Sequence, residues 1–217
     1  MSLTSWRYMW RTTPTHRREV PGSWVEDAPP ALPDRVDLRE VKGVEDGVGP
    51  LFHRRYRARA RGASLPPEEV MARVGADPDR VAPSEFASFN KVRGEEGRLR
   101  PGDEFVVRMP GPWDGPVRVV EVTPCSFRLA TLEGHLEAGQ IDFSASGEGD
   151  LLFTIESWAR SADRLSDLLY DRLRMAKEVQ FHMWCSFLER IVRLSGGRMT
   201  GGIEVLTRRI EEGGNGE

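Results

Sequence analysis

Residues 131–140, TLEGHLEAGQ, carry the side chains in this sequence that most suggest acid–base chemistry. If the segment is extended, Glu133, His135 and Glu137 lie on one side of the chain. A carboxylate beside an imidazole raises the pKa of the imidazole and orients its ring, which is the pairing that general acid–base catalysis needs. The two glycines of the segment equally favour a tight turn or bulge with its polar side chains in solvent. The sequence leaves both interpretations open.

Three tryptophans form a second candidate group. Trp113 lies in a Pro- and Gly-rich loop, Trp158 in the last expected strand of a sheet, and Trp184 in the following helix. Large aromatic side chains from a loop, a sheet and a covering helix either line a cavity between these elements or fill a core. Both outcomes remain possible from the pattern.

The common catalytic and nucleotide-binding motifs do not occur. The chain has no GxxxxGK[ST], GxGxxG, HExxH, GxSxG or CxxC pattern, and it contains only four histidines. We therefore expect no metal site and no cofactor.

Composition indicates an ordinary globular protein. Hydrophobic residues make up 39% and charged residues 30%, and 217 residues suffice to bury a core without a disulfide or metal. The net charge of −3 does not favour a nucleic-acid partner, and no apolar run approaches the roughly 18 residues of a membrane span. Cys125 and Cys185 are isolated, which is typical of a reducing compartment, so we expect a cytoplasmic protein.

The order of the elements predicts an α+β protein. Residues 51–61 alternate between an apolar face, interrupted by Arg54, and a face carrying four arginines, which predicts a strand whose neighbour supplies carboxylates such as Glu156. A short helix is expected near residues 64–75, and a meander of about five strands from Phe105 to Ala159. Apolar residues at helical spacing predict one long helix over residues 161–194.

The two ends of the chain are expected to lie outside this domain. Residues 1–48 read as an irregular, proline-broken arm whose aromatic residues, including Trp24, pack on the domain or on a partner. Residues 49–196 would form the main domain. The tail, residues 197–217, contains the segment IEVL, which fits an edge strand or a short helix.

The succession of strand, two small helices, meander and long helix resembles the helix-grip fold of START-like and birch-pollen-allergen-like proteins. Residues 128–143 are similar to a strand pair of an uncharacterised bacterial and plant family, domain of unknown function nineteen-ninety, within that superfamily. The similarity extends over residues 51–191. The matching positions are Thr131, Leu132, Gly134, His135, Glu137, Gly139 and Phe143.

The resemblance implies a curved antiparallel sheet wrapped on a long C-terminal helix, with an N-terminal arm and a cavity for a hydrophobic or amphipathic small molecule. Together with the tryptophan pattern, it gives the following expected lining residues: Trp113, Leu129, Phe143, Phe153, Ile155, Trp158, Leu173, Ala176 and Val179. One alternative is an enzyme on the same fold, a cyclase, dehydratase or hydrolase, using His135 with Glu133 or Glu137. A further alternative is a protein-interaction module that uses the arm or the helix.

The length of the predicted helix divides it into two parts. Roughly 34 residues at 1.5 Å per residue reach about 50 Å, whereas a strand of ordinary length spans under about 27 Å. Residues 161–179 are therefore expected to cover the sheet. Residues 180–194 would need another cover, which the arm or a second copy of the chain in a homodimer could provide.

Overall fold

The computed structural model describes residues 13–109, 114–162 and 170–211, with side-chain burial in the long helix described from Glu178 onward. Within these residues the chain forms one nine-stranded sheet of order β1-β9-β2-β8-β7-β6-β5-β4-β3. The strands are β1 (Thr15–Pro21), β2 (Val48–Arg61), β3 (Ser88–Arg93), β4 (Glu104–Arg108), β5 (Asp114–Thr123), β6 (Ser126–Thr131), β7 (Glu137–Ser146), β8 (Leu151–Ser161) and β9 (Arg198–Ile210). The helices are α2 (Trp24–Asp27), α3 (Pro67–Ala76) and α5 (Tyr170–Leu194), with short 3-10 turns at Val44–Asp46 and Pro78–Arg80.

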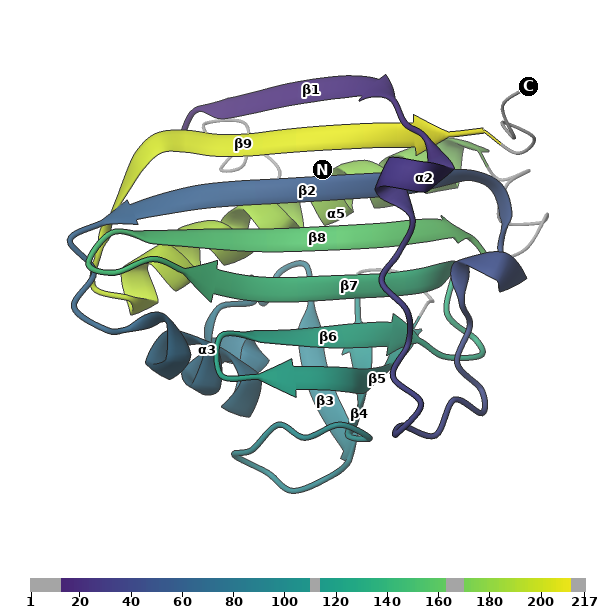
Figure 1. Ribbon diagram of the computed structural model, residues 1–217, viewed down its shortest axis with the longest axis horizontal. Coiled ribbons are helices and arrows are strands. Elements are labelled where there is room, and N and C mark those ends of the chain that lie inside the picture. Colours follow the sequence, from purple (N-terminus) through teal and green to yellow (C-terminus); the bar gives the residue numbers. More distant parts are fainter. Residues whose placement is uncertain (1–12, 110–113, 163–169, 212–217) are drawn as a thin grey trace.

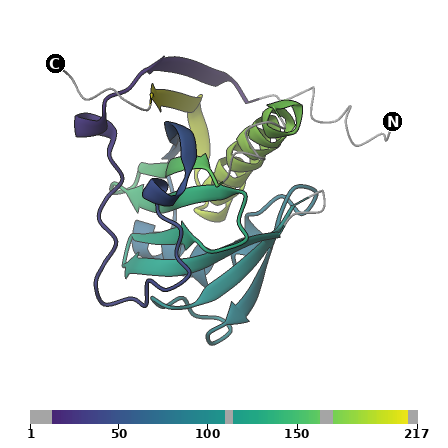
Figure 2. The same ribbon diagram turned by 90° about the vertical axis from the view of Figure 1, so that its right-hand side faces the viewer.

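The sheet is curved and has two differently covered faces (Figures 1 and 2). Helices α3 and α5 lie against one face, which we call the inner face. The segment from α2 to the start of β2 crosses the other, the outer face. Strands β4 to β8 form the expected five-stranded antiparallel meander, because turns and alternating apolar residues agree along this stretch.

The alternation of β2 is the clearest link between sequence and fold. Tyr56 and Ala58 are buried in the main core on the inner face. Arg55 lies on the outer face opposite Glu156 of β8, with 3.7 Å between their charged atoms. The expected cross-strand carboxylate is therefore confirmed.

The second half of α5 packs on the chain's own sheet, so the prediction that residues 180–194 need another cover is wrong. Phe181 lies 6.4 Å from Tyr56, and Phe187 lies 5.4 Å from Phe143, measured between ring centroids. The physical reason is strand length, since β2 has 14 residues and β8 has 11, far more than the strands assumed. At about 3.3 Å per residue β2 alone spans about 46 Å. The argument for a second copy of the chain over this helix is thereby lost.

Both ends of the chain add strands to the same sheet. β9 pairs antiparallel with β2, and β1 pairs parallel with β9, so the sheet is mixed rather than purely antiparallel. Part of the segment expected to be irregular is thus a strand. From β1, Arg17 reaches α5, where it lies over the Phe181 ring at 3.8 Å and pairs with Glu178 at 3.3 Å.

The N-terminal segment is held to the outer face by two polar clusters and by apolar contacts. His53 lies between Asp27, at 2.8 Å, and Glu156, at 2.7 Å, and stacks on Trp158. Val36 packs in a small outer cluster with Val120 and Ala130. Trp24, expected to be packed, keeps 43% of its surface exposed.

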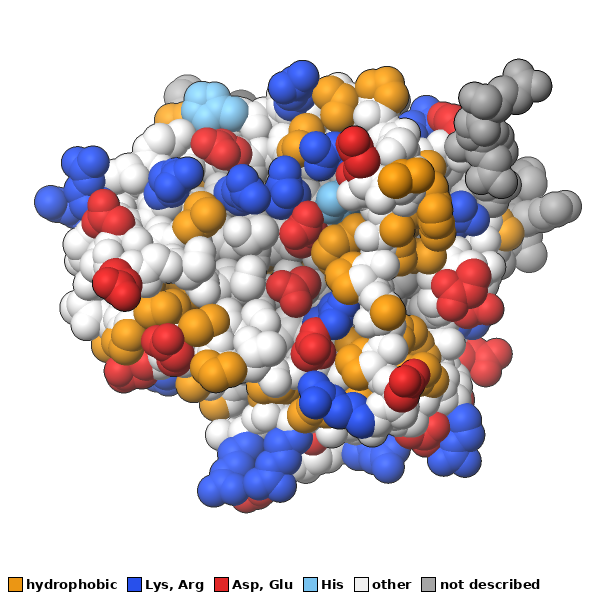
Figure 3. Space-filling view, viewed as in Figure 1, with side chains coloured by type: hydrophobic (Ala, Val, Ile, Leu, Met, Phe, Trp, Pro, Cys, Tyr) orange, Lys and Arg blue, Asp and Glu red, His pale blue; other side chains and the backbone are white. Residues whose placement is uncertain are grey.

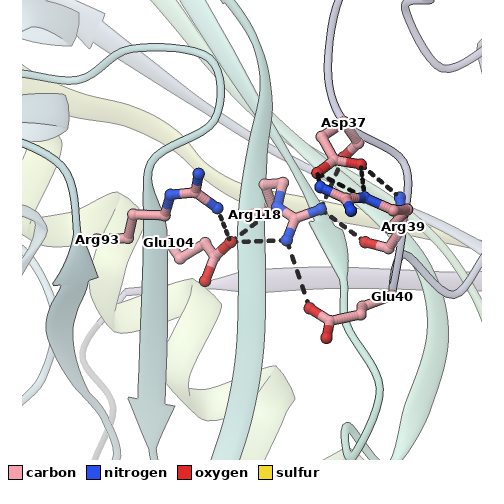
Figure 4. A network of polar contacts seen from close by, with 6 residues as sticks. All are labelled: Asp37, Arg39, Glu40, Arg93, Glu104 and Arg118. Atoms are coloured by element: carbon pink, nitrogen blue, oxygen red, sulfur yellow. Dashed lines mark hydrogen bonds and ion pairs between the residues drawn. The ribbon is translucent and has the colours of Figure 1, made fainter.

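Arg118 provides the second polar attachment (Figure 4). Its guanidinium is buried and donates to the Glu104 carboxylate at 2.7 Å and to the backbone carbonyls of Asp37 at 2.6 Å and Arg39 at 2.7 Å. A buried guanidinium is tolerated because its donors are satisfied. Arg39 also holds the pKa of the Asp37 carboxyl far below its ordinary value through a hydrogen bond.

A row of charged residues crosses the outer face from strand to strand. In sequence across the sheet it consists of Arg55, Glu156, Asp142, Arg128 and Glu121. Figure 3 shows this face, with Lys and Arg side chains over β2 and acidic side chains beside them. Asp142 is flanked by one carboxylate and one guanidinium. Burial raises its pKa to about 6, and Glu156 adds to that rise.

Candidate functional site

The inner face of the sheet divides into two parts that differ in side-chain size. The first part, which we call the filled half, contains large side chains. They extend over two neighbouring rows, one of which crosses four strands. Tyr56, Ile155, Phe143 and Phe127 lie opposite one another in this row, and Phe153 follows on β8. All are buried against Phe181, Trp184 and Phe187 of α5.

Little space is left inside the filled half. The internal cavity there measures about 10 Å³ and is lined by Leu129, Phe143, Phe187 and other apolar residues. A volume of that size is at most enough for one water molecule. Leu129, Phe143, Phe153 and Ile155, expected to line a ligand cavity, all lie in this core.

The second part, the small-residue half, begins one row further along the same strands. Its first row is Arg54, Ser157 and Ile141, and its second is Phe52, Ala159 and Gly139. On β6 the first row continues with Leu129, which is buried in the main core, and Ile141 packs against that core. These positions share the inner face because they are two and four residues from Tyr56, Ile155 and Phe143 in an unbroken register.

The small-residue half is incompletely covered. Ser157, Ile141 and Phe52 keep part of their surface exposed although they face the helix side of the sheet. Helix α5 runs along β2, since Phe181 contacts Tyr56 and the chain just after the helix approaches Ala60. The part of α5 before Phe181 therefore extends toward the end of β2 that carries Arg54. Ser157, Ala159 and Gly139 project less from the sheet there than the aromatic residues of the filled half do.

Gly139 is required in this half by the backbone. Its φ is +154°, and a Cβ atom placed there would lie 1.9 Å from the carbonyl oxygen of Trp158. The site therefore demands glycine, which accounts for its place in the motif found by sequence.

His135 and Glu137 lie at the rim of the small-residue half. Glu137 is the first residue of β7, and its carboxylate accepts a hydrogen bond of 3.0 Å from Gln180 of α5. The His135 ring lies against Gly115, whose added Cβ would be 3.0 Å from Nε2. The helix and the sheet are thus joined here by polar side chains.

The surroundings of His135 favour a neutral ring. Burial lowers the pKa of its imidazole, and Glu137 opposes that shift only in part. Its Nδ1 accepts a hydrogen bond of 2.9 Å from the backbone N–H of Glu137, which places the proton on Nε2. The carbonyl oxygen of Glu137 is also 3.0 Å from Nδ1, and a bond to it requires the opposite tautomer.

Glu133 does not join this pair. It is exposed in the turn before His135, where Gly134 adopts a φ of +91°, and its backbone N–H donates to Glu40. The structure therefore combines the two interpretations of the segment. The glycine makes a turn that exposes Glu133, while His135 packs beside Glu137 and Glu137 contacts the helix.

Other expected lining residues are placed differently. Trp158 lies on the outer face, because it is three residues from Ile155 and side chains alternate between the two faces of a strand. It packs there with Val44, Leu51 and Ile210. Val179 is half-buried on α5. Trp113, and the side chains of Leu173 and Ala176, lie outside the described residues.

Several residues of this region were not predicted as site residues from the sequence, among them the polar Arg54 and Gln180 as well as Ile141 and Ser157. Arg54 carried a signal, because it interrupts the apolar face of the alternating segment that became β2. Gln180 carried none, since a polar residue in a long helix is ordinary. Tyr56, between the two halves, is buried, and burial raises the pKa of its phenol to about 12.

Neither a metal site nor a membrane-spanning helix is present in the part of the chain that is described. No three His, Cys, Asp or Glu side chains among these residues are grouped so that they could hold a metal ion. No described helix is both long and apolar enough to cross a membrane.

Comparison with known families assigns the chain to one of them. A family model described as domain of unknown function (DUF1990) matches residues 67–188, more than half of the sequence. The protein belongs to this family, as the resemblance implied. A search of curated proteins found no match.

Solved structures share the fold at low sequence identity. The di-domain ARO/CYC StfQ from the steffimycin biosynthetic pathway matches with a TM-score of 0.51 and 11% identity over 70% of this chain and 52% of its own. Norcoclaurine synthase from Thalictrum flavum gives 0.46 and 10% over 70% and 89%, and major latex-like protein 151 from Panax ginseng gives 0.42 and 16% over 66% and 97%. The curved sheet with its long C-terminal helix is a helix-grip, START-like fold, so the expected fold class is confirmed.

Proposed function

We propose that this protein binds a hydrophobic or amphipathic small molecule between the small-residue half of the sheet and α5. The observation that carries the proposal is the change in side-chain size along β7 and β8. Phe143 and Ile155 fill the layer beneath the helix, whereas Gly139, Ser157 and Ala159 do not. Ligand sites are mostly apolar hollows with a few polar groups that orient the bound molecule.

The surroundings of this half fit such a site. Ile141 and Phe52 offer apolar surface that is only partly covered. His135 and Glu137 supply polar groups at its rim, and Arg54 supplies one at its inner edge. The binding residues are therefore proposed to be Arg54, Ile141 and Ser157 rather than the fully packed core.

A thermal-shift screen against lipids, isoprenoids and polyketides tests the proposal. Ser157→Leu should fill the layer under α5 and abolish the stabilisation that a ligand gives to the wild-type protein. Ser144→Leu is the matched control, since Ser144 is a half-buried serine on the outer face of β7. The proposal fails if no compound stabilises the wild type, or if Ser157→Leu and Ser144→Leu respond equally to every ligand.

An enzymatic role is the second candidate, and the His135–Glu137 arrangement favours it. Glu137 contacts Gln180 of α5, the His135 ring lies beside Glu137 and against Gly115, and the lowered pKa of His135 keeps its imidazole neutral near pH 7. With its proton on Nε2, the ring can donate to a bound molecule, and it can act as a base in the other tautomer.

Ligands from the screen can be incubated with the protein and followed by mass spectrometry. An enzyme of this kind should convert one of them, and His135→Asn should abolish conversion while leaving the unfolding midpoint in place. Conversion that persists in His135→Asn removes His135 from the mechanism. Unchanged ligands would remove the enzymatic candidate and leave the binding proposal standing.

A further inference from the structure

Arg54 is a buried cation on the inner face of the sheet. Only 8% of its surface is exposed, although it lies two residues from Tyr56 on the face that packs under α5. Ser157 lies directly opposite Arg54 on β8.

Arg54 has no anionic partner within the described residues. Its guanidinium lies 4.7 Å from the centre of the Phe52 ring, a cation–π contact that compensates burial only in part. Carboxylates pair with the other two strongly buried arginines, Arg118 with Glu104 and Arg128 with Glu121, although the Nε of Arg128 has no hydrogen-bond partner. A buried charge without an anionic partner is unfavourable, and Arg54 differs from those two in lacking a described carboxylate.

The acids nearest on the same face are directed elsewhere. The Glu137 carboxylate accepts a hydrogen bond from Gln180, and Glu178 forms an ion pair with the exposed Arg17. Glu19 is two strands away, in the row of Arg54 through Thr207, and is exposed at the sheet edge. The positive charge of Arg54 therefore faces the small-residue half without a carboxylate from the described chain.

We propose that Arg54 binds the carboxylate of an amphipathic ligand whose apolar part lies over Ile141 and Ala159. This inference rests on the proposed function and names the chemical class of the ligand: a long-chain monocarboxylate, such as a fatty acid. A guanidinium presents paired N–H donors that match the two oxygens of one carboxylate.

A single carboxylate fits the polar groups present. Arg54 supplies one positive charge, and the Ser157 hydroxyl beside it supplies a neutral donor. Tyr56 adds no negative charge below pH 12, because burial raises the pKa of its phenol to about 12. A phosphate with two negative charges would lack a second buried cation on this face among the described residues.

The test compares decanoate, 1-decanol and decyl phosphate by isothermal titration with the full-length protein. Wild-type protein should bind decanoate more tightly than decanol by about ten- to a hundredfold, the range expected for a charge-assisted hydrogen bond. Arg54→Met should lose this preference and bind the two equally, while keeping its affinity for decanol. Arg59→Met is the matched control, because Arg59 is exposed on the outer face of the same strand, and it should behave as wild type.

Stability measurements separate ligand binding from a structural role. If Arg54 is an unpaired charge awaiting a ligand, Arg54→Met should leave the unfolding midpoint of the free protein unchanged or raise it. A marked fall in the midpoint, with Arg54→Lys restoring it, would mean that the charge has a structural partner and would overturn the inference.

The outcomes distinguish carboxylate binding by Arg54 from the more general proposal that an apolar molecule binds at the small-residue half. Equal affinity of the wild type for decanoate and decanol overturns the role of Arg54 but supports the proposed binding of apolar molecules. Tighter binding of decyl phosphate than of decanoate overturns the assignment to a monocarboxylate. Failure of all three compounds, together with a failed screen, overturns both.

Discussion

The filled half and the small-residue half of the sheet lie under one helix and on the same strands, yet they differ in what their side chains can do. In the filled half, aromatic rings from β6, β7 and α5 stack and leave a cavity of about 10 Å³. In the other half, serine, alanine and glycine face α5, and an arginine without a described partner lies among them. Successive rows of a single sheet thus differ in packing, and the less tightly packed rows are where we propose that the ligand binds.

The outer face of the sheet is covered differently from both halves of the inner face, and its cover helps to explain how the inner face can differ between its two halves. The N-terminal segment and its clusters around His53 and Arg118 cover that face, so the sheet does not depend on its small-residue half for support. Strands of 14, 13 and 11 residues are long enough to hold both halves. A shorter sheet would need every inner residue for its core.

The largest expected effect comes from truncating neighbouring residues of β7 in the two halves. Phe143→Ala should lower the free energy of unfolding by about 3–5 kcal/mol, because it removes a ring packed between Phe127, Trp184 and Phe187. Ile141→Ala, two residues away and half-buried, should cost less than about 2 kcal/mol. Urea denaturation measures both, and equal losses would remove the distinction between the halves.

An intermediate effect is expected on the outer face, where Asp142 lies opposite Glu156. The pKa of Asp142 is raised from 3.8 to about 6, so the folded state holds its proton more tightly than the unfolded state, and stability falls as pH rises through that range. Asp142→Asn should therefore stabilise the protein at pH 7–8 by about 1 kcal/mol after allowance for solvent screening.

Thermal unfolding at several pH values checks this prediction. The advantage of Asp142→Asn should disappear below about pH 4, where the wild-type carboxyl is protonated in both states. An Asn variant that is less stable than wild type at pH 8 would mean that Arg128 depends on Asp142 for its charge partner.

The smallest effect is expected at the rim of the small-residue half. Burial lowers the pKa of His135 below its ordinary value of 6.5, so the unfolded state binds the proton more readily and stability falls as pH drops below that value. His135→Gln should reduce this loss between pH 7 and pH 5. The slope of unfolding free energy against pH measures it, and an unchanged slope would show that the ring is as solvated in the folded as in the unfolded state.

Local patterns predicted much of the fold. The alternation around Tyr56 and the five strands of the meander follow from side-chain spacing, and the structure contains them. The long helix was predicted from residue 161, but Ser161 ends β8; the helix is described from Tyr170 and its buried apolar side chains from Glu178 onward. The partner of Arg55 was also predictable, since a row of like charges on a strand requires acids opposite.

What depended on distant contacts was not predictable. Neither the parallel pairing of β1 with β9 nor the cover for Phe181 could be derived without the lengths of β2 and β8 in space. Ser64, at the start of the segment expected to be helical, lies before α3 and hydrogen-bonds the Ser195 carbonyl, 131 positions away. No local pattern indicated that tertiary contact.

The candidate site was only partly predictable for the same reason. His135 and Glu137 follow from their motif, but the turn that separates Glu133 depends on the φ of Gly134. Trp158 looked like a lining residue because tryptophans often line cavities, and the parity of β8 places it on the other face. Gln180 could be recognised as part of the site only from its hydrogen bond to Glu137 in the folded chain.

The central claim is that ligand binding belongs to the small-residue half and not to the filled half. It is tested most directly by NMR of the protein labelled at the methyl groups of isoleucine and titrated with the tightest ligand from the screen. Ile141 lies in the small-residue half and Ile155 in the filled half, one row apart. The account predicts that the Ile141 methyl signals shift on titration while those of Ile155 stay in place. Shifts confined to Ile155, or a bound ligand that moves neither, would contradict it.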